Sequence, residues 1–67
     1  MELEKLNNYI RDRHYPINAL SDDLNITRQS MYMKLTGERD FKASEMVILA
    51  KVLRMTNDEI LDIFFNK

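Results

Sequence analysis

Few residues of this 67-residue chain have the types and spacing that catalysis or metal binding requires. The chain has no cysteine, which excludes a thiolate nucleophile and thiolate metal ligands. The single histidine, His14, lies shortly before Pro16 at an expected helix end, with no partner at a recognised spacing. The acidic residues Asp58, Glu59 and Asp62 are explained by a helix start, where negative charge is favoured. We therefore expect no enzyme activity, no metal, no cofactor and no small-molecule substrate.

The charged residues are distributed unevenly along the chain. The formal net charge is −1, but residues 1–25 carry −2, residues 26–54 carry +3 and residues 55–67 carry −2. Local charge, rather than net charge, determines contacts with polyanions. A nucleic-acid contact is therefore expected between Ile26 and Arg54.

Helices are the elements that must position these residues, because one glycine and one proline are too few for a fold built on tight hairpins. The apolar spacing predicts one domain, residues 1–67, with five helices and short connections. The helices are expected from Leu3 to about Arg13, then from Pro16, from Arg28, from about Lys42 to Ser44, and after Thr56. No apolar run approaches the roughly 20 residues that a membrane span needs, so no membrane partner is expected.

The connection between the second and third helices has the clearest local signals. Asn25 tolerates the left-handed conformation and can end one helix, and Thr27 is a good N-cap for a helix that begins at Arg28. Gly37 supplies a left-handed residue just past the end of that helix. Two short helices joined by a three-residue turn have the outline of a helix-turn-helix, here over about residues 17–36.

The outer face of the third helix carries side chains that can read DNA bases. Met31 and Leu35 form the apolar stripe of this helix, and at about 100° per residue Gln29 and Met33 lie opposite that stripe. Glutamine can pair with adenine, arginine with guanine, and an exposed apolar side chain can contact a thymine methyl group. The candidates for base contact are therefore Arg28, Gln29, Ser30, Tyr32 and Met33.

The segment Ile26-Thr27-Arg28-Gln29-Ser30-Met31-Tyr32, followed by Lys34-Leu35-Thr36-Gly37 and then Phe41, resembles a known family. With five expected helices, it is similar to the DNA-binding domain of phage repressor and Cro proteins, the XRE-type helix-turn-helix regulators, and in particular to short prophage regulators of Gram-positive bacteria. The resemblance implies an all-α, lambda-repressor-like five-helix bundle whose third helix, about residues 28–36, enters the major groove. It further implies a cytoplasmic bacterial transcription regulator in a phage genetic switch, bound to double-stranded operator DNA as a dimer.

The resemblance also implies contacts with the DNA backbone. Family members use the loop after the third helix and the start of the fourth helix to hold phosphates. In this chain those positions are Thr36, Arg39 and Lys42, and Thr27 is a further candidate at the start of the third helix. Such contacts set the register of the protein on DNA but carry no sequence information directly.

A second interpretation keeps the fold but makes a protein the partner. Asp22 and Asp23 place negative charge on the second helix, which in this fold runs near the phosphates, and charges closer than the Debye length of about 8–10 Å would weaken DNA binding. The protein would then be an antirepressor or modulator that forms a heterodimer with a companion repressor. The candidate contacts are Ile17, Tyr32 and Met33, with Ile60, Leu61, Ile63, Phe64 and Phe65 of the fifth helix. That helix is too apolar for one narrow stripe, so it is also a candidate surface for a homodimer.

Overall fold

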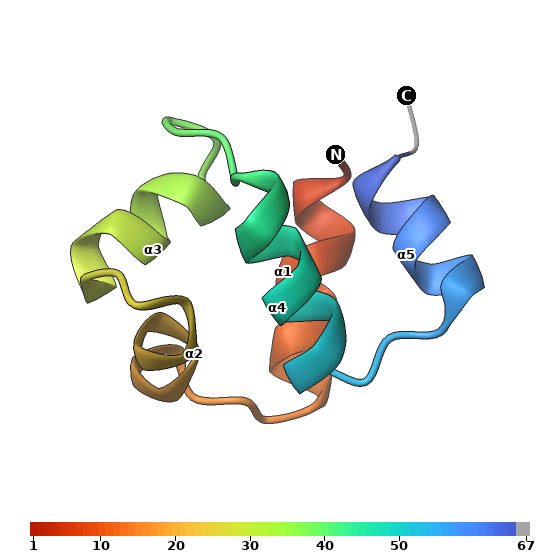
Figure 1. Cartoon of the computed structure of the whole chain (residues 1–67), viewed down its shortest axis with the longest axis horizontal. Helices are drawn as coiled ribbons and strands as arrows, with labels where there is room; N and C mark the ends of the chain where they lie inside the picture. Colours follow the sequence, from red (N-terminus) through yellow and green to blue (C-terminus); the bar gives the residue numbers. More distant parts are fainter. Residues whose placement is uncertain (66–67) are drawn as a thin grey trace.

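The apolar spacing of the sequence produces five α-helices in the computed structural model, which describes residues 1–65 (Figure 1). They are α1 (Leu3–Asp12), α2 (Ile17–Leu24), α3 (Arg28–Leu35), α4 (Ala43–Val52) and α5 (Asn57–Phe64). No strand is present in the described part of the chain, so the predicted all-α class is confirmed. The last two residues of the predicted domain lie outside the described residues.

Side-chain caps set the starts of α3 and α5. The Thr27 Oγ1 accepts a hydrogen bond from the Ser30 N–H at 3.0 Å, as expected for the N-cap of α3. Thr56 and Glu59 form the reciprocal pair at the start of α5, with distances of 3.2 Å and 2.9 Å. Because these bonds satisfy N–H groups that have no partner within the helix, they fix where each helix begins.

The end of α2 also agrees with the sequence. Asn25 adopts the left-handed conformation, with φ of 57°, and turns the chain directly into α3. The start of α2 differs by one residue, because Pro16 precedes the helix as its N-cap instead of lying in its first turn. At that position the missing proline N–H has no consequence, while the Pro16 carbonyl still accepts the first helical bond, from the Leu20 N–H.

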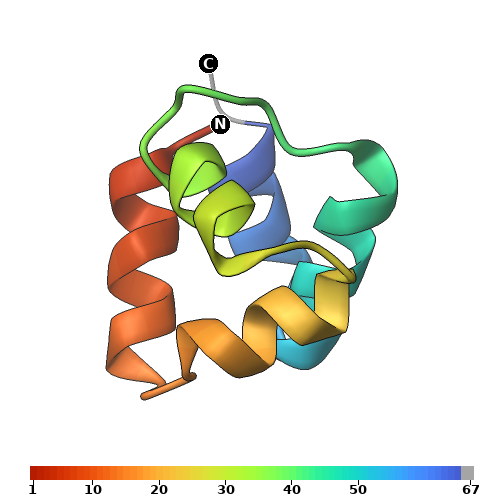
Figure 2. The same ribbon diagram turned by 90° about the vertical axis from the view of Figure 1, so that its left-hand side faces the viewer.

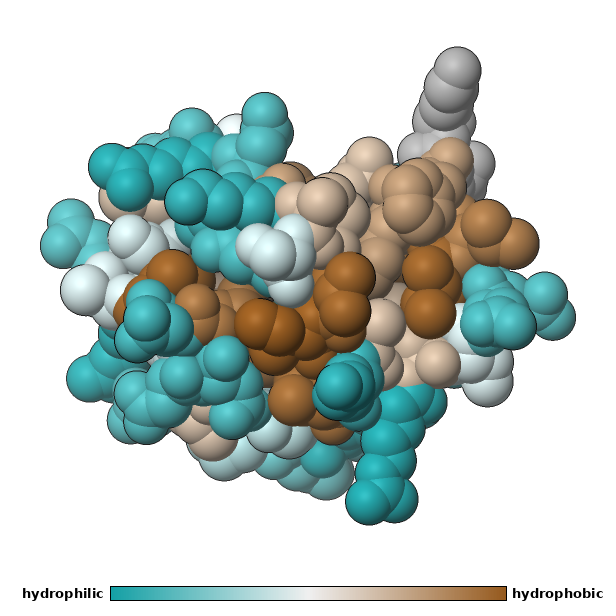
Figure 3. Space-filling view, in the orientation of Figure 1, coloured by the Kyte–Doolittle hydropathy of each residue, from teal (hydrophilic) through white to brown (hydrophobic). Residues whose placement is uncertain are grey.

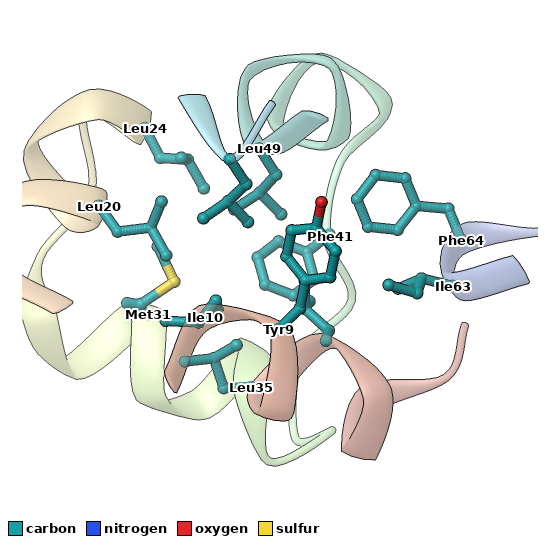
Figure 4. Packing of buried hydrophobic residues seen from close by; sticks show 12 residues of the cluster. Tyr9, Ile10, Leu20, Leu24, Met31, Leu35, Phe41, Leu49, Ile63 and Phe64 are labelled. Carbon is teal, nitrogen blue, oxygen red and sulfur yellow. The ribbon is translucent and has the colours of Figure 1, made fainter. Parts of the chain in front are cut away.

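One core joins all five helices, and it holds the inner face of α3. Figure 4 shows Leu20 and Leu24 of α2, Met31 of α3 and Leu49 of α4 pointing toward one another. Met31 is fully buried and Leu35 nearly so, as the spacing predicts. Truncating a core side chain such as Met31 to alanine costs about 2–5 kcal/mol. Burial of this inner face holds α3 in place and leaves its outer face outside the core.

The packing of α5 corrects part of the predicted partner surface. Ile63 and Phe64 are only 3% and 7% exposed, so both belong to the core, and of the two only Phe64 reaches the surface, where it lines a groove beside α4. Their stripe faces inward because α5 packs on α1, where the Glu2 N–H donates to the Ile63 carbonyl at 2.7 Å. Ile60 is partly buried against the core, as is Ile17 on α2. The exposed apolar residues of this helix region are Leu61 and Phe65.

The arrangement of the helices separates two surfaces. Helices α2 and α3 form one side of the molecule, which faces the viewer in Figure 2, and α5 lies on the other side of Figure 1. Helix α4 packs against α2, and α1 contacts both α3 and α5. Asn7 of α1 ties α3 in place, because its Nδ2 donates to the carbonyls of Leu3 at 2.9 Å and Leu35 at 3.2 Å.

Candidate nucleic-acid interface

Four of the five candidate base-contacting side chains border one shallow depression on the outer face of α3. This α3 depression is lined by Arg28, Gln29, Tyr32, Met33, Thr36 and Glu38. The exposed members are Arg28, Gln29 and Tyr32. Met33 was expected to point fully outward, but it is half-buried. The fifth candidate, Ser30, is also half-buried and faces a different hollow beside α2. The structure therefore groups Arg28, Gln29, Tyr32 and Met33, and separates Ser30 from them.

The chain folds back over the last turn of α3 and bonds to the backbone of Met33. The Met33 carbonyl accepts hydrogen bonds from the N–H groups of Glu38 at 2.9 Å and Arg39 at 3.2 Å. It also accepts one from the Thr36 hydroxyl at 3.2 Å. Gly37 makes this turn with φ of 90°, a conformation that other residues rarely adopt. Loop 36–42 is thereby fixed to α3.

The two threonines predicted to contact phosphate differ in what they can still donate. Thr36 uses its single hydroxyl hydrogen on the Met33 carbonyl, so it has no donor left for a phosphate. The Thr27 oxygen accepts from the Ser30 N–H and keeps its own hydrogen available. Because its hydroxyl can still donate a hydrogen bond, Thr27 is the better candidate for a phosphate contact.

A buried ion pair holds loop 36–42 between α3 and α4. The Lys34 Nζ lies 2.5 Å from the Glu45 Oε1, with side chains only 8% and 7% exposed. The same oxygen accepts the Lys42 N–H at 2.8 Å, and Lys34 also lies near the Asp40 carbonyl and 5.9 Å from the centre of the Phe41 ring. Burial by itself would raise the pKa of Glu45, but the bonds from Lys34 and the Lys42 N–H outweigh burial and hold that pKa below its ordinary value.

This pair was not predicted from the sequence, and the charge of +3 for residues 26–54 therefore includes Lys34 as a cation available to a polyanion. The two residues are 11 apart, so they share no local helical spacing that could have revealed the contact. The exposed cations that remain near α3 are Arg28, Arg39 and Lys42. The other two, Lys51 and Arg54, lie at the far end of α4. That end is joined to α1 by a hydrogen bond of 2.9 Å from the Arg13 Nε–H to the Leu53 carbonyl.

The two acidic residues of α2 have different surroundings. Asp23 accepts a hydrogen bond from the Tyr15 hydroxyl, and this bond is the main cause that raises the pKa of Tyr15. Asp22 instead borders the hollow that Thr27 and Ser30 line at the start of α3. Of the pair, only Asp22 therefore lies beside the candidate interface.

A second exposed apolar surface lies between α4 and α5. This α4–α5 groove is lined almost wholly by apolar side chains, from Ala43, Met46, Val47, Ala50, Ile60, Phe64 and Phe65. Val47 is 64% exposed and Phe65 is 65% exposed. Figure 3 shows apolar side chains gathered over α4 and α5 on this face. The contribution of Val47 was missed because it lies inside an apolar run, where periodicity does not distinguish an inner from an outer side.

No metal site and no membrane helix occur in the described part of the chain. Within residues 1–65, no group of three or more histidine, aspartate and glutamate side chains could hold a metal ion. No helix among these residues is both long and apolar enough to cross a bilayer.

A scan of protein-family models finds no match to this chain, and no match is found among curated proteins or solved structures.

Proposed function

We propose that the protein is a sequence-specific DNA-binding regulator of the Cro and repressor type. In this proposal α2, residues 25–27 and α3 form a helix-turn-helix of a lambda-repressor-like bundle, and α3 enters the major groove. The observation that carries the proposal is the α3 depression, which presents Arg28 and Gln29 beside the exposed Tyr32 and the half-buried Met33. The eight residues of α3 span about 12 Å, comparable to the width of the B-DNA major groove.

The ends of α3 supply the contacts that would orient it on DNA. Thr27 and Arg28 lie at its start, and loop 36–42 carries Arg39 and Lys42 past its end. The Thr27 hydroxyl at one end of a groove-bound helix and the two cations at the other end can contact phosphates on either side of the groove. The buried Lys34–Glu45 pair supports this role, because it fixes the loop that presents two of these cations.

A salt-titrated binding assay tests the proposal, with sites selected from random double-stranded DNA and with DNA from the chain's own genomic neighbourhood. The two cations that would contact phosphates, Arg39 and Lys42, predict that log K falls with log salt with a slope of about −1.8 per bound chain. Arg28→Ala or Gln29→Ala should weaken binding to the selected site by about 1–3 kcal/mol, because each removes a base contact.

Arg54→Ala is the matched control, since it removes an exposed cation just past the far end of α4 and should leave affinity unchanged. The absence of binding to any of these DNAs at low salt would contradict the proposal.

We also propose that two chains associate through the α4–α5 groove. The groove exposes Val47 and Phe65, and Leu61, 59% exposed, extends the same apolar surface on α5. Lys51 follows Val47 by one turn on α4, and Asp58 precedes Leu61 by one turn on α5. In a twofold pair each α4 edge can face the partner's α5 edge, which brings opposite charges together.

A companion repressor bound in this groove would instead support the modulator function, with Tyr32 and Met33 as further contacts.

A further inference from the structure

The α3 depression exposes mostly apolar surface although most of its lining residues are polar. Tyr32, 49% exposed, and the half-buried Met33 are the two lining residues with large apolar side chains. Arg28 and Gln29 border it toward the start of α3, and Glu38 borders it toward loop 36–42. An open apolar hollow surrounded by polar groups is suited to a small apolar group presented by a polar surface.

The major groove of DNA presents one such group. The 5-methyl group of thymine is the apolar feature of the four base edges there, whereas the other features are hydrogen-bond donors and acceptors. The thioether sulfur of Met33 has no hydrogen to donate and is only a weak acceptor, and the Met33 carbonyl, which can only accept, already accepts three hydrogen bonds. Methionine is, however, flexible and adapts its shape to an apolar partner.

We infer that the α3 depression binds thymine 5-methyl groups, with Met33 and Tyr32 as the specificity-determining contacts. This inference rests on the proposed function, since it requires α3 to lie in the major groove. The operator half-site therefore contains thymine opposite the middle of α3, next to the base that Gln29 contacts. Recognition at this position depends on contact with the methyl group and not on a hydrogen bond.

The test uses the full chain and a DNA site selected from random sequence, in which each thymine is replaced in turn by deoxyuridine. Deoxyuridine keeps the hydrogen bonds of thymine and lacks only the methyl group. At one or two positions the replacement should weaken binding about fourfold, the factor that burial of one methyl group gives. Cytosine in place of that thymine should also bind weakly, and 5-methylcytosine there should recover part of the affinity.

The variants assign the methyl contact to its residues. In Met33→Ala and Tyr32→Ala the penalty for deoxyuridine should fall below twofold, because the apolar partner is gone. Asp12→Ala, which removes an exposed side chain at the far end of α1, should keep the full penalty. Since Tyr32 is exposed, its variant should retain the fold even if Met33→Ala does not.

Two results overturn the inference, and they are distinguishable. A tightly bound selected site that tolerates deoxyuridine at every thymine would overturn methyl recognition while leaving DNA binding in place. A failure to select any DNA at low salt would overturn the proposed function and the inference together.

Discussion

The pairing of Lys34 with Glu45 removes one cation from those available for the proposed contact with DNA. Six basic residues lie between residues 26 and 54, but Lys34 is neutralised inside the protein and two others lie at the far end of α4. Burying two charges is costly, and removing one partner alone costs about 3–5 kcal/mol because the other remains uncompensated. The pair therefore acts on function through the position of loop 36–42 and not through its charge.

Glu45→Gln should lower the free energy of unfolding by about 3 kcal/mol at neutral pH, because Lys34 keeps its buried charge without a counterion. The double variant Lys34→Met with Glu45→Gln should recover most of that loss, since the glutamine oxygen can still accept the Lys42 N–H. Urea unfolding monitored by circular dichroism measures both. A double variant as unstable as the single one would contradict this account.

The same pair gives stability a defined pH dependence. Folding lowers the pKa of Glu45, so its contribution is fully present above the pKa of the unfolded chain and is lost as the pH falls through the lowered folded value. Glu59 adds a dependence of the same sign, because bonds from the Thr56 N–H and the Tyr9 hydroxyl lower its pKa. Stability should therefore decline below about pH 5, and less steeply in the variants that lack Glu45.

At the scale of the helices, sequence and structure agree where the physics is local. Asn25, Thr27 and the reciprocal pair of Thr56 and Glu59 act on backbone groups within a few residues, so their effect could be predicted without knowing the fold. The orientation of α5 could not be predicted. The helix has two apolar stripes, one with Ile63 and one with Leu61, and only packing on α1 decides which is buried.

The candidate site was predictable to a similar extent. The 3.6-residue period placed Gln29 outward from the buried Met31, and the structure places it at the α3 depression. The half-burial of Met33, the bond from the Thr36 hydroxyl to the Met33 carbonyl and the chain that folds back after Gly37 were not predicted. That fold-back depends on tertiary contacts around loop 36–42, for which the sequence offers no periodic signal.

The two acidic residues of α2 provide a matched test of the interface. Asp22→Asn should strengthen DNA binding about two- to fivefold, because a negative charge near the start of α3 repels phosphates across partly screened solvent. Asp23→Asn should have a smaller effect on DNA affinity, since Asp23 bonds to Tyr15 and does not border the hollow at the start of α3. Binding titrations on the same selected site compare the two variants. Equal effects would show that α2 does not approach DNA in the expected orientation.

For the whole molecule, the α3 depression and the α4–α5 groove belong to different helices on different sides (Figures 1 and 2). One chain can therefore use both surfaces at the same time. A dimer that holds two copies of α3 gains affinity for a two-part operator, because binding of the second α3 becomes intramolecular. Protein association would then act on DNA binding without any contact between the groove and DNA.

Phe65→Asp should abolish dimer formation in sedimentation runs at high micromolar concentration, because it places a charge in an apolar groove. It should lower affinity for a full two-part operator by at least about a hundredfold and leave affinity for an isolated half-site unchanged. Tyr32→Asp is the matched control, which should keep the dimer and weaken DNA binding. A wild-type chain that stays monomeric, yet forms a complex with a companion repressor, would favour the modulator function.

The bond between Glu2 and Ile63 brings the beginning and the end of the described chain together, beside loop 36–42. Met1 lines a hollow with Arg39, and Phe65 belongs to the α4–α5 groove. A tag next to Met1 would therefore crowd Arg39, a candidate phosphate contact, and a group attached near Phe65 would crowd the α4–α5 groove. Asp12, exposed at the opposite end of α1, is a better attachment point. Because the chain has no cysteine, Asp12→Cys would provide one labelling position for fluorescence measurements.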